Sequence, residues 1–189
     1  MVEKKPRRAD RPFRLVDAMI LTAATAVGLA GVRGLMEGLG PMTYPTGLST
    51  GRLYLAMAET FLLVGSPLLA AWSAAVVPIR LIPPRPPRRR LGVQPGMVAA
   101  CGTILALAAV VGAAVACNLA PTGAFTKELA TWVLAAPGAV GVAILASWMT
   151  LILGRRWRAE PTWIDRLGRV LATAWFATWL AALHILHLS

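Results

Sequence analysis

The stretch IRLIPPRPPRRRL at residues 79–91 decides how the rest of the chain is arranged. It places five arginines and four prolines between two long apolar runs. Short loops rich in Lys and Arg stay on the cytoplasmic side of a membrane. The proline pairs remove backbone donors and favour an extended polyproline II conformation, so we expect a stiff, non-helical loop. A loop fixed inside the cell sets the direction of every apolar run on either side of it.

The composition is that of a membrane protein. Hydrophobic residues make up 57% of the 189 residues, charged residues make up 14%, and the mean hydropathy is +0.65. A soluble domain carries about 25% charged residues. The sequence therefore predicts a multi-pass membrane protein rather than a soluble enzyme.

The net charge of +11 has two readings. A strongly basic chain can bind nucleic acid. Here the basic residues lie in the segments between apolar runs, where membrane orientation requires them, so we expect no nucleic-acid partner. We expect the bilayer itself, with its anionic headgroups, to be the partner of these residues. The basic residues predicted to face the headgroups are Arg85, Arg88, Arg89, Arg90, Arg155 and Arg156.

Five apolar runs follow a basic cytoplasmic tail at residues 1–14. Each run has about the 20 residues that a helix needs to cross the hydrocarbon core. Segments with glycine, proline or charge separate them. We therefore predict an all-α fold, an integral membrane bundle in one domain at residues 15–189. The predicted spans are residues 15–36, 53–77, 97–117, 129–153 and 167–188.

The distribution of basic residues predicts the topology. With the N-terminus inside, sixteen of the nineteen Lys and Arg fall in the cytoplasmic segments, and only three fall outside. This bias predicts a cytoplasmic N-terminus and an external C-terminus in a bacterial inner membrane. An odd number of spans and the lack of a visible internal repeat argue against a simple duplicated transporter.

The first run resembles a signal peptide in its charged start and in a small-residue site at residues 24–26. Its apolar character continues to Leu35, so we expect an uncleaved anchor helix. Asp17 lies near Arg14 at the inner end of this run, and we expect a structural ion pair there.

Several residues predict breaks and close contacts. Pro67, preceded by Gly65, predicts a kink in the second run, and Pro78 predicts its end. Residues 137–138, Pro-Gly, predict a kink in the fourth run. Small residues spaced by four permit close helix packing. They recur in the first run at Ala24 and Gly28, and in the third run, which we therefore expect at the centre of the bundle, at Ala108, Gly112 and Ala116.

The cysteines and tryptophans are read as structural. Cys101 and Cys117 lie in one run and are expected to be small core residues. Most of the seven tryptophans are expected to serve as interface anchors and in packing. Trp175 and Trp179, four residues apart, predict an aromatic face toward lipid or a partner subunit.

Charged residues within membrane runs are costly and tend to be functional. Arg33 and Glu37 are four apart and can pair on one helix face. Arg33 is also predicted to pair with Glu59, either as an ion pair that fixes helix registry or as the centre of a binding or proton-handling pocket. His184 and His187 lie at the same predicted depth, but no third ligand lies near them in sequence, so we predict no metal and no cofactor. The predicted outer-half polar cluster is Arg33, Glu37, Glu59, His184 and His187.

The segment RPFRLVDAMILTAATAVGLAG at residues 11–31 resembles the opening of multi-pass membrane proteins of planctomycete-type bacteria. The resemblance covers about one-ninth of the chain. It implies a membrane fold and no particular activity. It rests on Arg11, Phe13, Arg14, Leu15 and Asp17.

Three functions fit the sequence. The first is a non-enzymatic accessory or structural subunit that packs with itself or with a larger membrane complex. The second is a small transporter or channel-like carrier that uses Glu59 and Arg33. The third is an enzyme acting on lipid at the outer leaflet, with Glu59 or His184 as acid or base. We favour the first, because small-residue helix faces and short loops are present and catalytic constellations are not visible.

Overall fold

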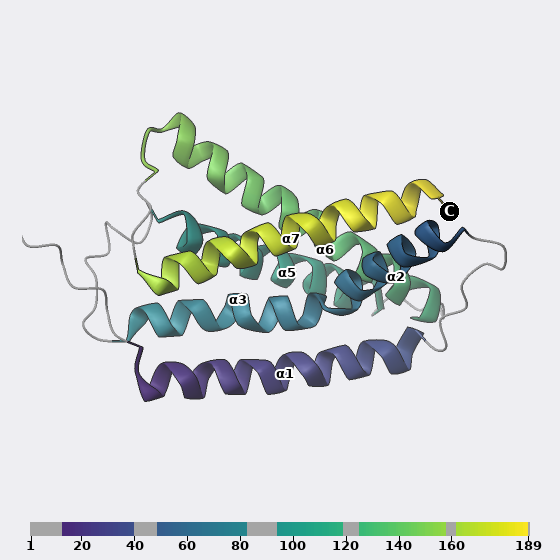
Figure 1. The fold of residues 1–189 in the computed structure, drawn as a ribbon, viewed down its shortest axis with the longest axis horizontal. Helices are drawn as coiled ribbons and strands as arrows, with labels where there is room; N and C mark the ends of the chain where they lie inside the picture. Colours follow the sequence, from purple (N-terminus) through teal and green to yellow (C-terminus); the bar gives the residue numbers. More distant parts are fainter. Residues whose placement is uncertain (1–12, 40–48, 83–93, 119–124, 158–161, 189) are drawn as a thin grey trace, which may run out of the picture.

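The computed structural model describes residues 13–39, 49–82, 94–118, 125–157 and 162–188, and within these ranges it is helical without strands. Each of the five predicted runs coincides with helix, and the second run is divided in two (Figure 1). The helices are α1 (Leu15–Leu39), α2 (Thr50–Val64), α3 (Ser66–Leu81), α5 (Pro95–Asn118), α6 (Phe125–Leu153) and α7 (Trp163–Leu188).

Among the described residues, three helices are long and apolar enough to cross a membrane. These spans are Leu15–Glu37 in α1, Pro95–Ala116 in α5 and Ala135–Leu153 in α6. Only 11%, 17% and 28% of their residues, respectively, are buried inside the chain. Apolar side chains therefore cover most of the outer surface of these helices, which is the arrangement that a lipid environment favours.

The centre of the bundle is α7, which packs against α2, α3, α5 and α6. Its buried residues recur at alternating steps of four and three, so they form one continuous stripe. The expectation that the third run is central holds only for the first half of α5. The residues of α5 are largely buried from Gly96 to Thr103 but mostly exposed from Leu105 onward. The stripe on α7 is Ile164, Gly168, Leu171, Trp175, Thr178 and Ala182.

Small residues on α1 allow α3 to approach closely, as predicted. A Cβ placed on Gly28 would lie 2.8 Å from Cα of Leu68. Ala24, one turn earlier, packs against the core cluster that α3 helps to form. The indole N–H of Trp72 in α3 donates to Oγ1 of Thr25 in α1 at 3.0 Å, which adds a polar link to the apolar contact.

The break in the second run lies at Gly65, between α2 and α3, and confirms the predicted interruption. Pro67 lies in the first turn of α3, where a missing backbone N–H costs no helical hydrogen bond. The run was predicted to end at Pro78 and the proline-rich loop; α3 passes Pro78 and ends at Leu81, shortly before the prolines of residues 83–87. Pro78 is so near the end of the helix that it removes one internal hydrogen bond without stopping it.

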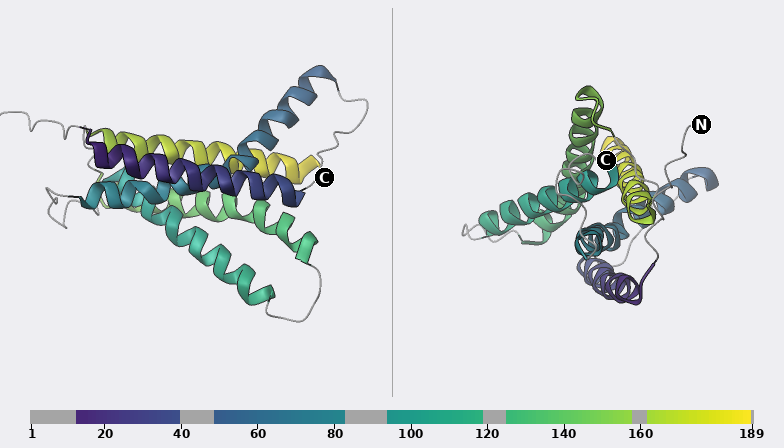
Figure 2. Two further views of the ribbon diagram at one scale, coloured as in Figure 1. Left: turned by 90° about the horizontal axis from the view of Figure 1, so that it is seen from below. Right: turned by 90° about the vertical axis from the view of Figure 1, so that its left-hand side faces the viewer.

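The two ends of the bundle differ in compactness. At one end α1, α3, α7 and the start of α5 lie close together, although the last turns of α6 diverge from them (Figure 1). Toward the other end, α2 and the second half of α5 diverge from the common axis (Figure 2). The two core clusters draw on α3, the first half of α5, α6 and the first half of α7. Tight packing is therefore concentrated at the compact end and in the middle of the bundle.

Candidate functional site

The compact end is also the basic end of the described chain. The first residues of α1, α5 and α7 and the last residues of α3 and α6 lie toward this end (Figure 1). Arg33 and Arg52 lie toward the opposite end. The described arginines of the basic end are Arg14, Arg80, Arg155, Arg156, Arg166 and Arg169.

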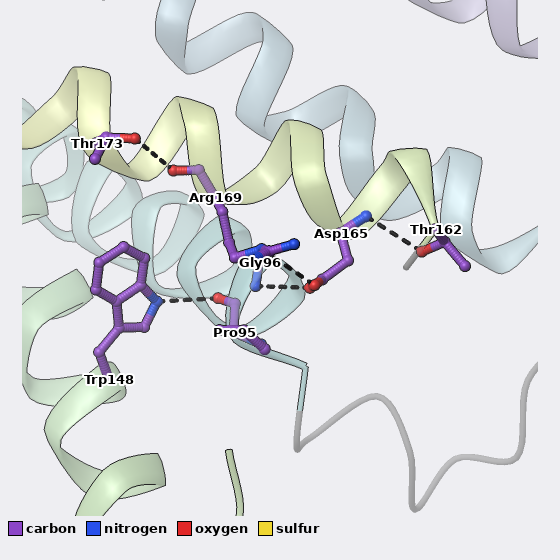
Figure 3. Close-up of polar contacts among 7 residues, drawn as sticks. All are labelled: Pro95, Gly96, Trp148, Thr162, Asp165, Arg169 and Thr173. Carbon is purple, nitrogen blue, oxygen red and sulfur yellow. Dashed lines mark hydrogen bonds and ion pairs between the residues drawn. The ribbon is translucent and has the colours of Figure 1, made fainter. Parts of the chain in front are cut away.

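A buried carboxylate joins α5 to α7 at this end (Figure 3). Asp165 is 3% exposed, and its Oδ1 accepts the backbone N–H of Gly96 at 2.9 Å. The first backbone N–H groups of a helix have no partner within it. Asp165 in α7 therefore caps the start of α5. Its Oδ2 lies 3.3 Å from Nε of Arg169, one turn further along α7.

The backbones of α5 and α7 come very close around this carboxylate. A Cβ on Gly96 would overlap the backbone oxygen of Asp165, and a Cβ on Gly168 would lie 2.6 Å from the oxygen of Gly96. Glycine is required at both positions because the helices meet backbone to backbone. This approach brings Asp165 within hydrogen-bonding distance of Gly96.

Trp148 connects α6 to both of its neighbours. Its indole N–H donates to the carbonyl of Pro95 at 3.1 Å. Its ring lies 5.6 Å from that of Trp157 in an edge-on arrangement, and 5.8 Å from that of Phe176 in α7. The starts of α5 and α7 and the end of α6 are thus held in one fixed arrangement.

The turn that ends α6 has unusual backbone geometry. The N–H of Arg156 bonds to the carbonyl of Leu151 at 2.8 Å, and that of Arg155 bonds to the carbonyl of Ile152 at 3.0 Å. Arg155 has a φ of +50°, a value that no other described non-glycine residue approaches. These features define a Schellman motif, in which the left-handed position is usually glycine. Here an arginine occupies it, and both arginines are exposed.

The first turn of α1 is capped by one of its own side chains. Asp17 is fully buried, and its Oδ2 accepts the backbone N–H of Arg14 at 3.0 Å. The prediction joined these two residues by an ion pair. The structure shows a helix-capping bond between them, of the kind that an acidic residue in the first turn commonly makes, and the ion pair stays a prediction.

The predicted outer-half cluster is described in part. Arg33 Nε lies 2.7 Å from Oε1 of Glu37, which confirms their pairing on one face of α1, with side chains 83% and 65% exposed. His184 and His187 are exposed near the end of α7. Since α1 packs chiefly on α3 and has no extensive contact with α7, these two pairs lie on helices that are not direct neighbours. The side chain of Glu59 lies outside the described residues, so its pairing with Arg33 stays a prediction.

Two other predictions about side chains were wrong. Trp175 is buried and its indole N–H lies 3.3 Å from Oγ of Ser73, while the ring of Trp179 lies against Gly141. This aromatic face therefore packs inside the bundle. Cys101 is exposed rather than part of the core, and the side chain of Cys117 lies outside the described residues.

Of the predicted headgroup-facing residues, Arg155 and Arg156 are described and exposed, and the four in residues 85–90 lie outside the described ranges. Within the described part of the chain, no three His, Cys, Asp or Glu side chains form a group that could hold a metal ion. The cap made by Asp165 was not predicted from the sequence. An acidic residue in the first turn of a helix was its one visible signal.

Comparisons of the chain with family models, curated proteins and solved structures found no match. The class is therefore defined by the fold and composition. The chain is an all-helical protein whose α1, α5 and α6 are suited by length and composition to cross a membrane, which indicates a membrane protein.

Proposed function

We propose that the chain crosses a bacterial inner membrane five times, with the N-terminus in the cytoplasm and the C-terminus outside. The spans are α1, α2 with α3, α5, α6 and α7. Helices α2 and α3 have 15 and 16 residues, so each is about 23 Å long at 1.5 Å per residue. The hydrocarbon core is about 30 Å thick, so the two cross it together as one broken span.

The central position of α7 supports its role as a span. It has 26 residues, about 39 Å of helix, but it carries more polar and aromatic residues than α5 or α6. The buried stripe of α7 meets other helices rather than lipid, so polar and aromatic residues are accommodated there. The basic end, where the first residues of α1 lie, corresponds to the cytoplasmic side under the positive-inside rule.

For this membrane protein we propose a non-enzymatic role as an accessory or structural subunit that packs with itself or with a larger membrane complex. The observation that carries this proposal is the uncovered surface in the second half of α5. A Cβ on Gly112 would meet nothing within 4 Å, whereas one on Gly28 or Gly141 would clash with a neighbouring helix. Small residues permit tight helix association in membranes. The exposed small residues are Ala108, Ala109, Gly112, Ala113 and Ala116.

Native mass spectrometry of the tagged protein, purified in a gentle detergent, tests this role. We expect a homo-oligomer or a complex of fixed stoichiometry. Gly112→Leu should reduce the assembled fraction at least threefold, because the larger side chain keeps a partner helix away. Val142→Leu, on an exposed face of α6, is the matched control and should assemble as the unchanged protein does. A wild-type protein that is monomeric and without partners would contradict the proposal.

A further inference from the structure

The arginines at the basic end fall into two groups. Arg169 pairs with Asp165, and Arg80 is largely buried. Arg155 and Arg156 are exposed, and neither has an acidic partner among the described residues. The two described acidic residues at this end, Asp17 and Asp165, are buried in their capping contacts. Two adjacent guanidinium groups therefore present their charge outward without a counter-charge from the described chain.

The backbone that carries these two arginines is held in one conformation. The left-handed conformation costs an L-residue other than glycine about 1–2 kcal/mol. Arg155 adopts this conformation, although the adjacent residue is Gly154 and glycine adopts it without that cost. Such strain persists where the surroundings determine the conformation, and it gathers at functional positions. The two hydrogen bonds back to Leu151 and Ile152 provide that constraint here.

The turn is also fixed relative to the other helices. Trp157, the residue after Arg156, packs edge-on against Trp148. Trp148 is in turn bonded to the carbonyl of Pro95 at the start of α5. Tryptophan rings favour the headgroup region of a bilayer. The pair thus places Arg155 and Arg156 at the level of the lipid phosphates.

Apolar surface adjoins the two charges. Ile152 and Leu153, in the last turn of α6, are 54% and 76% exposed. A guanidinium group binds two phosphate oxygens at once through parallel N–H donors. A free phosphate ion would use the arginines alone, whereas a phospholipid would use both the charges and the apolar surface beside them.

We propose that the turn at residues 154–157 binds the phosphodiester group of an anionic phospholipid, with an acyl chain along the exposed end of α6. Arg155 and Arg156 hold the phosphate oxygens, and Trp157 fixes the depth of the turn. This inference rests on the proposed membrane position of the basic end. It does not depend on which side of the membrane that end faces, or on a protein partner.

The test is lipid retention by the purified full-length chain in detergent, measured by native mass spectrometry with phosphatidylglycerol and phosphatidylcholine. We expect the unchanged protein to retain phosphatidylglycerol in preference, and Arg155→Gln with Arg156→Gln to lower that retention about tenfold. Arg52→Gln is the matched control, because Arg52 is exposed and lies at the opposite end. It should retain the lipid as the unchanged protein does.

A second variant separates charge from conformation. Arg155→Gly introduces a residue that adopts the left-handed conformation readily, and it removes one guanidinium group. We expect weaker retention of phosphatidylglycerol together with an unchanged or higher melting temperature. If lipid retention and the melting temperature both fell, impaired folding would explain the loss of lipid. That result would overturn the proposal for Arg155.

Three results would overturn the lipid site. One is equal retention of phosphatidylglycerol and phosphatidylcholine, and another is full retention by the double variant. The third is displacement of the lipid by millimolar inorganic phosphate, which would identify a simple phosphate site. Because the measurement uses isolated protein, a reversed topology or a monomeric chain would leave its result unchanged.

Discussion

At the scale of single residues, buried polar groups connect helices that are far apart in sequence. Asp165 caps α5 from α7, and Trp175 reaches Ser73 in α3. Each bond crosses between helices inside an apolar bundle, where an unpaired polar group is costly. These contacts therefore fix how the helices are placed relative to one another.

Asp165→Asn tests the cap at the start of α5. The amide oxygen can still accept the N–H of Gly96, but the charge that faces Arg169 is lost. We expect a loss of about 1–3 kcal/mol in the free energy of unfolding. Thermal unfolding followed by circular dichroism in detergent measures it. Arg166→Gln, an exposed change on the same turn, is the control and should melt as the unchanged protein does. An unchanged melting temperature for Asp165→Asn would mean that the charge of Asp165 facing Arg169 adds nothing to the stability of the cap.

A double-mutant cycle tests the contact between Trp175 and Ser73. Trp175→Phe removes the donor, and Ser73→Ala removes the acceptor. We expect a coupling of about 0.5–1.5 kcal/mol, because each single change removes the same hydrogen bond. Unfolding of the four proteins in the same detergent supplies the numbers. Strictly additive losses would mean that the two side chains do not interact.

At the scale of the elements, the sequence predicts the length of each helix but not which helices pack against it. Apolar runs of about 20 residues predict the helices, and Gly65 with Pro67 predicts the break between α2 and α3. The smooth surface of α5 also predicted a central place for it. That holds only for its first half, because small residues permit close packing but do not determine whether a helix packs there. The buried stripe of α7 instead carries Trp175 and Thr178, whose interior place depends on contacts with other helices.

The same limit applies to the candidate site. The basic residues of the compact end are visible in sequence because charge bias needs only a count along the chain. The bond from Asp165 to Gly96 spans 69 residues, and the close approach of Gly96 and Gly168 exists only once α5 and α7 are side by side. No sequence pattern within either apolar run predicts that α5 and α7 pack together at these glycines.

Substitutions of glycines test which helix faces pack against a neighbouring helix. A Cβ on Gly141 would lie 2.5 Å from the ring of Trp179, while one on Gly112 would meet open space. We expect Gly141→Ala to lower the free energy of unfolding by about 1–3 kcal/mol through overpacking. Gly112→Ala should raise it by about 0.5–1 kcal/mol in the isolated chain, because alanine favours helix. Chemical denaturation of the two variants in the same micelles makes the comparison. Equal effects at the two sites would contradict the arrangement of α5, α6 and α7.

At the scale of the whole molecule, charge and packing coincide at one end. The compact end carries the exposed arginines and the two capping carboxylates, while α2 and α5 diverge toward the other end (Figure 2). A compact, basic end suits contact with anionic headgroups on the cytoplasmic side. The diverging end leaves small-residue surface on α5 available to a partner. The proposed orientation places the basic end in the cytoplasm and the diverging end outside.

The measurement that tests this orientation most directly is a pair of reporter fusions after residue 189 in living bacteria. Five spans with an internal N-terminus predict an active alkaline phosphatase and a dark green fluorescent protein at that position. The same reporters inserted at residues 83–93 should give the opposite pattern. Fluorescence at residue 189 with inactive phosphatase would place the C-terminus in the cytoplasm and contradict the five-span, N-inside arrangement.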